Sequence, residues 1–337
     1  MRPAVQELSD WAGLMKAAIR SEQGLAFADV PVPDVGPDEV RVKVTAATLN
    51  HADLSIVEGR MHGKIGGIGS ILGLEFAGTV DAVGFRVRHM KPGDQVMASG
   101  KGAFAEFAIA DRGTVTHLPR PGMPLDEAAG LPVALRTMHD AVVTRAQVQR
   151  GDCVLVQGAS SAVGLMAMKI ARLRGAGKVI GTSTTPERRA RLLEHGASLA
   201  IDSRDPDWPA AVMEATGGHG VDVVIDQLSG PFMNQNMQAC ALNARVVNVG
   251  RLAGKVHDFD FDLHALKRIR YIGVTFRTRT PEEVREINRL MMADLGTALA
   301  AGELDLPVAA RFPFDQLADA YEHMRQNRHF GKIVIQM

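Results

Sequence analysis

A short apolar run, a loop of small residues and a helical segment follow one another between residues 153 and 171. The run CVLV at 153–156 is too short for a helix and predicts a buried strand. The loop GASSAVG at 158–164 is small except for one valine, and good helix formers follow it. This order predicts the start of a dinucleotide-binding unit, because N–H groups at the helix N-terminus can approach a pyrophosphate. An ordinary tight strand-to-helix turn is the alternative.

The next expected strand, residues 178–182, ends without an acidic residue at its tip. NAD-binding folds usually carry Asp or Glu there, whereas Ser183, Thr184 and Thr185 follow here, with Arg188 and Arg189 just beyond. A carboxylate would repel a 2′-phosphate, but hydroxyl groups and a guanidinium would bind it. The sequence therefore favours NADP(H) over NAD(H). A solvated first turn of helix is the alternative for the two arginines.

Charge and composition argue against several classes of protein. The chain has 38 acidic residues and 38 Lys plus Arg, so no excess charge points to nucleic acid or to a membrane surface. No apolar run approaches the thickness of a bilayer. Cys153 and Cys240 show neither pairing nor metal-ligand spacing, and we expect reduced thiols in a cytoplasmic protein. A chain of 337 residues, 46% hydrophobic, can build two domains.

The pattern of the chain changes near residue 125. Short β-type runs separated by Gly and Pro fill residues 16–119 and predict a small barrel-like domain. Helical segments are expected over 125–131 and 134–148, and strands then alternate with helices from 153 to 276. That alternation predicts a parallel, doubly wound sheet with helices on both faces, so the fold class is α/β. A long helix over 281–301, a shorter one over 316–327 and a strand over 332–336 end the chain.

This order resembles the medium-chain dehydrogenase/reductase superfamily over nearly the whole chain. The marks of the resemblance are KPGDQV at 91–96, AAGLP at 128–132, GD at 151–152, the loop at 158–164, HGA at 195–197 and GKIV at 331–334. The resemblance implies a GroES-like β-barrel domain over 15–131 and 298–337 and a Rossmann NADP(H)-binding domain over 132–297. Residues 1–14 are then an N-terminal extension. A small-molecule substrate would bind between the domains, and the edge strand near residues 271–276 would pair across a two-fold axis in a homodimer.

Zinc-dependent members of that superfamily bind the metal through a Cys, a Gly-His-Glu and a third ligand. Here Asn50 and Leu74 stand where the Cys and the His would be, and two cysteines cannot form the four-Cys structural lobe. His51, Asp53 and Glu75 suggest another metal site, although a single His beside a polar turn is more often structural. We therefore predict no metal.

Asn50 and Asp53 match the Asn-x-x-Asp of the zinc-independent quinone oxidoreductase (zeta-crystallin-like) branch. That resemblance implies hydride transfer from NADPH to a quinone or another conjugated carbonyl compound. Asn50 would donate a hydrogen bond to the nicotinamide ribose or the substrate. Asp53 would orient the groups around that contact or relay a proton through water. A turn-capping role is the alternative for Asp53. Ser55, Val57 and Ser203 stand where the branch commonly has Tyr, Arg and Tyr.

Cofactor contacts are expected in the small-residue loop, at the carboxyl ends of the strands and on the helix before the loop. The expected contacts are Thr137, Ser160, Ser161, Ala162, Val163, Gly164, Ser183, Arg188, Ser203, Gly250, Arg251 and Phe276. Gly250 as a simple turn residue and Phe276 as a core residue are the alternatives.

Two further functions stay open at this point. A reductase of α,β-unsaturated carbonyl compounds, such as an enoyl thioester reductase, uses the same hydride chemistry on carbon. A catalytically quiet nucleotide-binding module would bind the cofactor without turnover. A short-chain dehydrogenase is excluded, because it needs Lys four residues after a catalytic Tyr, and Tyr271 and Tyr321 are followed there by Thr275 and Arg325.

Overall fold

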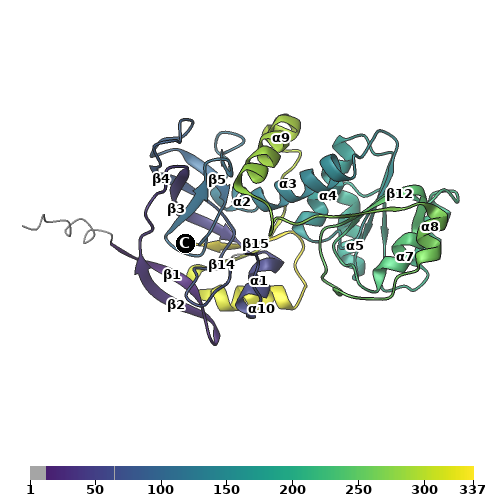
Figure 1. The fold of residues 1–337 in the computed structure, drawn as a ribbon, viewed down its shortest axis with the longest axis horizontal. Coiled ribbons are helices and arrows are strands. Elements are labelled where there is room, and N and C mark those ends of the chain that lie inside the picture. Colours follow the sequence, from purple (N-terminus) through teal and green to yellow (C-terminus); the bar gives the residue numbers. More distant parts are fainter. Residues whose placement is uncertain (1–12, 64) are drawn as a thin grey trace, which may run out of the picture.

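Two sheets of different construction occupy the two lobes of the molecule (Figure 1). The computed structural model describes residues 13–63 and 65–337. Most of the expected N-terminal extension, residues 1–12, therefore lies outside the described residues. The α/β class is confirmed, with a barrel-like sheet in one lobe and a doubly wound parallel sheet in the other.

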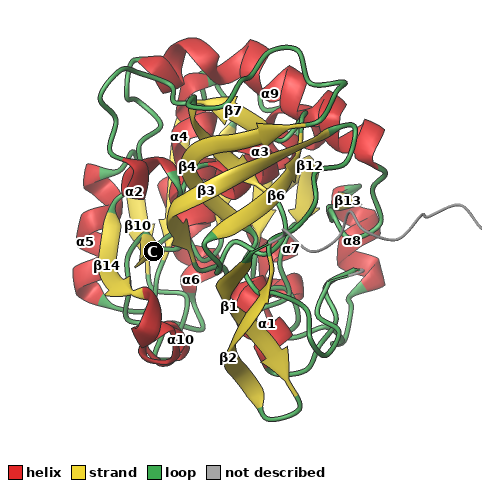
Figure 2. Cartoon of the chain, turned by 90° about the vertical axis from the view of Figure 1, so that its left-hand side faces the viewer, coloured by secondary structure: helices red, strands yellow, loops and turns green. Residues whose placement is uncertain are grey.

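The first lobe is built mainly from antiparallel strands (Figure 2). Its strands are β1 (Leu14–Ser21), β2 (Gly24–Pro31), β3 (Glu39–Thr48), β4 (Glu75–Val83), β5 (Gln95–Ser99), β6 (Phe107–Asp111), β7 (Val115–His117), β14 (Val308–Pro313) and β15 (Lys332–Gln336). Among the described residues β1 and β2 form a separate hairpin, and the main sheet has the order β14-β15-β3-β4-β5-β7, with β6 paired to β3. The last strand thus returns to the first lobe, as the resemblance implies.

Short helices pack on this sheet. They are α1 (His51–Val57), α2 (Leu125–Ala128), α10 (Leu317–Arg325) and the 3₁₀ turn η2 (Phe314–Gln316). Strand β15 pairs with β3 so that Val334 faces Thr48, and the N–H of Leu49 donates to the carbonyl of Ile333 at 3.1 Å. This pairing brings the end of the chain beside the start of α1.

The second lobe holds the parallel sheet. Its strands are β8 (Cys153–Val156), β9 (Lys178–Thr182), β10 (Leu199–Ile201), β11 (Val221–Asp226), β12 (Cys240–Asn248) and β13 (Arg270–Gly273). Its helices are α3 (Pro132–Met138), α4 (Ala162–Leu173), α5 (Pro186–Glu194), α6 (Trp208–Ala215), α7 (Phe232–Ala239), α8 (Phe261–Lys267) and α9 (Pro281–Ala300). The strand order β10-β9-β8-β11-β12-β13 is that of a dinucleotide-binding fold, and its topological switch point lies between β8 and β11.

The helical segment expected over residues 134–148 is not one continuous α-helix. Helix α3 ends at Met138, and a π-helix, η1 (His139–Arg145), follows it. Two consecutive buried polar side chains begin this turn, and both have partners. His139 Nε2 lies 2.7 Å from Asp294 Oδ2, and Asp140 accepts from Arg279 at 2.6 Å. The spacing of hydrophobic residues in the sequence cannot predict such contacts between distant polar residues.

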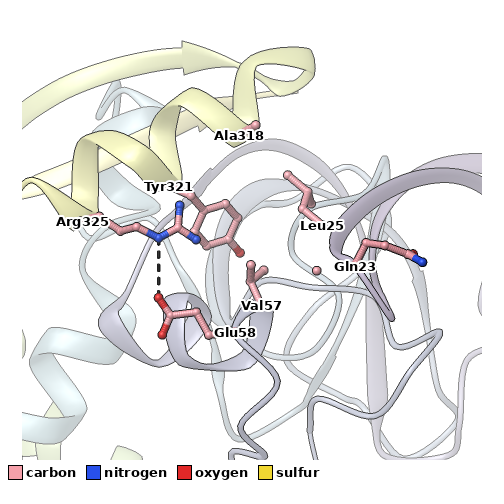
Figure 3. Close-up of a pocket in the computed structure, with 8 residues that line it drawn as sticks. Gln23, Leu25, Val57, Glu58, Ala318, Tyr321 and Arg325 are labelled. Carbon is pink, nitrogen blue, oxygen red and sulfur yellow. Dashed lines mark ion pairs between the residues drawn. The ribbon is translucent and has the colours of Figure 1, made fainter.

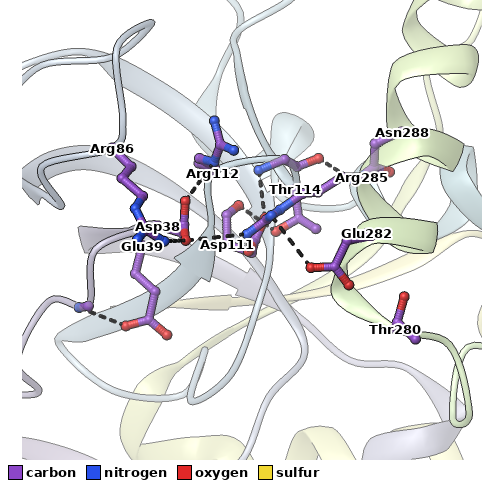
Figure 4. Close-up of polar contacts among 12 residues, drawn as sticks. Asp38, Glu39, Arg86, Asp111, Arg112, Thr114, Thr280, Glu282, Arg285 and Asn288 are labelled. Carbon is purple, nitrogen blue, oxygen red and sulfur yellow. Dashed lines mark hydrogen bonds and ion pairs between the residues drawn. The ribbon is translucent and has the colours of Figure 1, made fainter.

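Helix α9 is fastened to the first lobe by a network of ion pairs (Figure 4). Arg285 donates to both carboxylate oxygens of Asp111, from Nε at 2.9 Å and from Nη2 at 2.6 Å. Asn288 donates to the carbonyl of Gly113 at 2.6 Å. Asp38 pairs with Arg112 at 3.0 Å and extends the network into the barrel. The helix that follows the parallel sheet therefore bridges the two lobes, and the predicted domain boundary at residue 297 stays a prediction.

This network predicts a difference between two arginines on one helix. Arg285→Met should lower the free energy of unfolding by about 1 kcal/mol, because it removes a two-pronged, partly buried ion pair. Arg289→Met is the matched control, since Arg289 is 64% exposed and pairs only with Glu286 on its own helix. Urea unfolding of the two variants checks this, and equal losses in both would contradict it.

Candidate functional site

A buried carboxylate lies where the barrel meets the second lobe. Glu75 is the first residue of β4 and is fully buried. It accepts from Thr48 Oγ1 at 2.6 Å, from Asn50 Nδ2 at 2.9 Å and from the N–H of Val133 at 2.9 Å. The ammonium of Lys332 forms an ion pair with the same carboxylate. Both oxygens of Glu75 are thus held by donors from strands β3 and β15 and from helix α3.

Asn50 is held in one orientation by this cluster. Its Nδ2 donates to Glu75, and its Oδ1 accepts from Lys332 Nζ at 3.1 Å. The N–H of Asn50 donates to Asp53 Oδ2 at 2.8 Å. Asp53 therefore makes the contact expected of a turn-capping residue, which is the alternative to a catalytic role. A catalytic role for Asn50 or Asp53 stays a prediction. The group Asn50, Glu75 and Lys332 is called the polar cluster below.

The Asp53 carboxyl is electrostatically unusual. It is fully buried, and burial raises its pKa to about 7, against the opposing effect of the hydrogen bond from Asn50. Its second oxygen, Oδ1, has no hydrogen-bond partner among the described residues. The Asp53 carboxyl is therefore harder to ionise than an ordinary aspartate, and it lies next to the polar cluster.

The small-residue loop has the geometry that the sequence predicts. Ser161 caps α4 by accepting from the N–H of Gly164 at 3.1 Å, and Ala162 and Val163 form the first turn of that helix. A Cβ on Gly164 would lie 2.6 Å from the backbone of residues 158 and 159, so only glycine fits there. Ser183 Oγ donates to Ser160 Oγ at 3.1 Å. The loop and the end of β9 are thus brought together.

Arg188 lies at the predicted place, but its donors are already in use. Nε donates to Thr185 Oγ1 at 3.1 Å, Nη2 to Thr184 Oγ1 at 2.8 Å and Nη1 to the carbonyl of Asn327 at 2.8 Å. The last contact joins the second lobe to the segment before β15. Ser203 is buried in the loop after β10, and Arg189 pairs with Asp202 at 2.9 Å.

The remaining predicted residues are spread along the strand ends. A Cβ on Gly250 would lie 2.4 Å from the carbonyl oxygen of Gln227, which fits its alternative role in a tight turn. Arg251 Nη1 donates weakly to the carbonyl of Val249 at 3.4 Å. Thr137 lies on α3, and Phe276 is half-buried, with the guanidinium groups of Arg136 and Arg279 4.6 and 5.3 Å from the centre of its ring.

Sequence reasoning missed Lys332 as a site residue and considered Glu75 only as a metal ligand. Lys332 precedes the apolar run IVI in the strand KIVIQ and is 3% exposed. A lysine at the start of a buried strand must be paired, because an isolated buried charge is very costly. That signal points to Lys332 but does not identify its partner, which is 257 positions away.

No metal cluster and no membrane-spanning helix occur in the part of the chain that the structure describes. No group of three or more His, Cys, Asp or Glu is arranged there to hold a metal ion. None of the described helices is long and apolar enough to cross a bilayer. Glu75 is held by three hydrogen-bond donors and an ammonium group instead.

Two cavities lie away from the polar cluster. One, of about 380 Å³, lies between the β1–β2 hairpin, α1 and α10, where Arg325 pairs with Glu58 at 3.5 Å (Figure 3). The other, of about 440 Å³, lies between β7 and α9. Neither is lined by any of the predicted site residues.

Two family models match the chain. The alcohol dehydrogenase GroES-like domain matches residues 36–120, and the zinc-binding dehydrogenase domain matches residues 162–293. Together they span more than half of the chain. The chain belongs to the medium-chain dehydrogenase/reductase superfamily of oxidoreductases, which confirms the predicted family and the GroES-like and Rossmann lobes.

The chain is similar to two kinds of curated protein. It is 29% identical over 325 residues to the mouse quinone oxidoreductase-like protein 2, covering 96% of this chain and 92% of that protein. It is 33% identical over 318 residues to a phthioceranic/hydroxyphthioceranic acid synthase of Mycobacterium tuberculosis. That match covers 92% of this chain but only 14% of the synthase. Quinone oxidoreductase-like proteins are thus among its relatives, as the sequence predicts.

The chain is also similar to an NADPH complex and to an enoyl reductase among solved structures. A mycobacterial protein in complex with NADPH has a TM-score of 0.85 and 25% identity, covering 96% of this chain and all of that one. The CurK enoyl reductase has a TM-score of 0.84 and 26% identity, covering 96% of this chain and 99% of that one.

The buried Asp53 carboxyl predicts a pH-dependent stability. Its pKa in the folded chain, about 7, is higher than that of an unfolded Asp, so folding takes up a proton between about pH 4 and 7. The free energy of unfolding therefore falls as the pH rises through that range. Asp53→Asn removes the group whose ionisation lowers the free energy of unfolding. The free energy of unfolding of the variant relative to wild type should therefore rise with pH, by at most about 4 kcal/mol.

Urea unfolding from pH 4.5 to 8 measures this difference. Asp202→Asn is the control, because arginine contacts lower the pKa of Asp202 to about 2 and move its titration below the range. The control should show a constant offset from wild type. A constant offset for Asp53→Asn as well would contradict the raised pKa.

Proposed function

We propose that this protein is an NADPH-dependent, zinc-independent oxidoreductase that transfers hydride to a quinone or a related conjugated carbonyl compound. The observation that carries this proposal is the polar cluster, which places an oriented amide and an ammonium group where the barrel meets the nucleotide-binding lobe. The family membership and the quinone oxidoreductase-like relative support it.

The residues present fit a bound NADP(H). The loop Ser160–Gly164 and the N-terminus of α4 would take the pyrophosphate, since Gly164 leaves no Cβ in a tightly packed turn. Ser183, Thr184 and Arg188 would take the 2′-phosphate, which requires Arg188 to exchange its bond with Asn327 for one with the phosphate. Thr137 and Phe276 would lie toward the nicotinamide. The NADPH complex of a structural relative supports this cofactor.

When bound, the cofactor would supply the hydride. The chain's own part is to orient the acceptor and to stabilise the negative charge that develops on its oxygen. The ammonium of Lys332 is a positive charge and a hydrogen-bond donor, and Glu75 and Asn50 keep it in place. The Asn50 amide offers its second N–H hydrogen to the same oxygen, since the first is directed at Glu75.

The absence of zinc is supported by the way Glu75 is bound. Asn50 and Leu74 stand where the superfamily's metal ligands would be, and the Glu75 carboxylate is already neutralised by Lys332. The name of the matched zinc-binding family does not settle this question, which a chelator tests directly.

A reductase of enone or enoyl double bonds is the second candidate. The 33% identity to a phthioceranic/hydroxyphthioceranic acid synthase and the likeness to an enoyl reductase structure favour it. The chemistry differs only in that hydride goes to carbon and a proton to the neighbouring carbon. A catalytically quiet nucleotide-binding module would bind NADPH without turnover.

We also propose that the protein is a homodimer, because β13 lies at the edge of its sheet, and that it is cytoplasmic.

Oxidation of NADPH and NADH, followed optically with an ortho-quinone and a simple enone, tests the function. We expect turnover of the quinone with NADPH that a zinc chelator does not change. Turnover of the enone alone would favour the second candidate. Loss of activity with chelator would contradict the metal-free site, and binding of NADPH without turnover of either acceptor would favour the quiet module.

Charge reversal at Arg188 tests the choice of cofactor. Arg188→Glu should raise the Kd for NADPH at least roughly tenfold, because a carboxylate would face the 2′-phosphate, and should change the Kd for NADH much less. Fluorescence titration with both cofactors measures this. Arg174→Glu, on the exposed end of α4, is the control for added negative charge. Equal weakening of both cofactors by Arg188→Glu would rule out the phosphate contact.

A further inference from the structure

One guanidinium group at the junction of the lobes forms no ion pair with any described carboxylate. Arg136, on α3, donates from Nη1 to Ser99 Oγ at 2.6 Å, and its Cζ lies 4.6 Å from the centre of the Phe276 ring. Its Nε is buried without a hydrogen-bond partner, and no described carboxylate forms an ion pair with it. The side chain is half-buried, so solvent reaches part of it.

A neighbouring arginine shows the contrast. Arg279 lies on the same Phe276 ring, 5.3 Å from its centre, but it pairs with the buried Asp140 at 2.6 Å. Burial lowers the pKa of Arg136 to about 10, so the group stays charged at neutral pH. A charged group this closely packed is normally paired. Two guanidinium groups thus share one aromatic ring, and only one of them has a carboxylate.

The unpaired group lies beside the polar cluster. Ser99 is directly opposite Glu75 in the β4–β5 ladder, so the two side chains share one face of the sheet. One turn before Arg136, the N–H of Val133 donates to Glu75, and Thr137 follows Arg136 in the chain. The negative charge of Glu75 acts on Arg136 and partly offsets the lowering of its pKa, but Glu75 forms no ion pair with it, and Thr48, Asn50, Val133 and Lys332 hold its two oxygens.

We propose that Arg136 binds a carboxylate of the substrate, so that the preferred acceptors are conjugated carbonyl compounds that carry a carboxylate close to the reacting double bond. This inference rests on the proposed reductase function. A planar guanidinium is suited to a carboxylate, and among the described residues neither Nε nor Nη2 of Arg136 has a hydrogen-bond partner. Arg136 is then a specificity-determining residue rather than a participant in hydride transfer.

A purely structural role is the competing explanation. Through Ser99 of the barrel and Phe276 of the second lobe, Arg136 also links the two lobes. A structural link would affect all acceptors and the stability alike. A carboxylate site would affect only acceptors that carry the charge.

The experiment uses two acceptors that differ in one charge, a 4-oxo-2-enoic acid and its methyl ester, with NADPH as reductant. Wild type should show a KM for the acid roughly ten- to a hundredfold below that for the ester. Arg136→Met should raise the KM for the acid by about that factor relative to the KM for the ester, so that the preference for the acid is lost. Arg136→Lys should keep part of the preference, because it keeps the charge but not the planar fork.

Arg289→Met is the matched control, an exposed arginine on α9 changed in the same way. Equal use of acid and ester by wild type would overturn the inference without any variant. Equal losses for both acceptors in Arg136→Met, or a raised KM for NADPH alone, would assign Arg136 to the structure or to the cofactor instead.

A binding experiment distinguishes failure of the proposed reductase function from failure of the carboxylate site. If neither acceptor is reduced, calorimetric binding of the saturated acid and its ester in the presence of NADP⁺ decides the question. Tighter binding of the acid that Arg136→Met abolishes would support the carboxylate site although the reductase proposal had failed. Equal binding of acid and ester would overturn the site.

Discussion

The ion pair between Lys332 and Glu75 is the interaction around which the polar cluster is built. It joins the last strand of the chain to β4 of the barrel, and the N-terminal turn of α3 adds a donor from the other lobe. Buried ion pairs contribute little net stability, because the loss of hydration offsets most of the Coulomb attraction. A better-packed apolar pair would hold the strands together at least as well. We infer that the pair is present for the charge and the donors that it places beside Asn50.

The charged groups near this pair differ in how completely their polar atoms are hydrogen-bonded. Glu75 has a full set of donors, Asp53 is buried with one oxygen unpartnered, and Arg136 is packed without an anion. Each of the last two groups departs from the rule that buried polar atoms are satisfied. Departures from that rule are expected at functional sites, where the missing partner is a proton or a ligand. Asp53 follows Asn50 by three residues and Arg136 follows Val133, a donor to Glu75, by three residues, so both groups lie near the polar cluster.

The local patterns of the sequence predicted the nucleotide-binding half well. Small residues at 158–164 and a buried run before them are sufficient to predict β8, the turn and α4, since backbone approach and helix capping are local properties. The partners Glu75 and Lys332 were not predictable in the same way, because strand pairing between β3 and β15 brings them together across the whole chain. The break between α3 and η1 was missed because it depends on partners such as Asp294 and Arg279.

The contact of Arg188 with the carbonyl of Asn327 concerns more than the adenosine end of the site. Asn327 and Lys332 belong to one short segment, and between them Phe330 lies beneath the Arg191 guanidinium at 3.9 Å while the N–H of Gly331 approaches the carbonyl of Ser160 at 3.4 Å. One strip of main chain therefore touches the region expected to hold the 2′-phosphate, the pyrophosphate loop and the polar cluster in succession. Asn327 and Lys332 are only five positions apart in the chain, so the residue that Arg188 contacts and the ammonium group of the polar cluster belong to the same short segment.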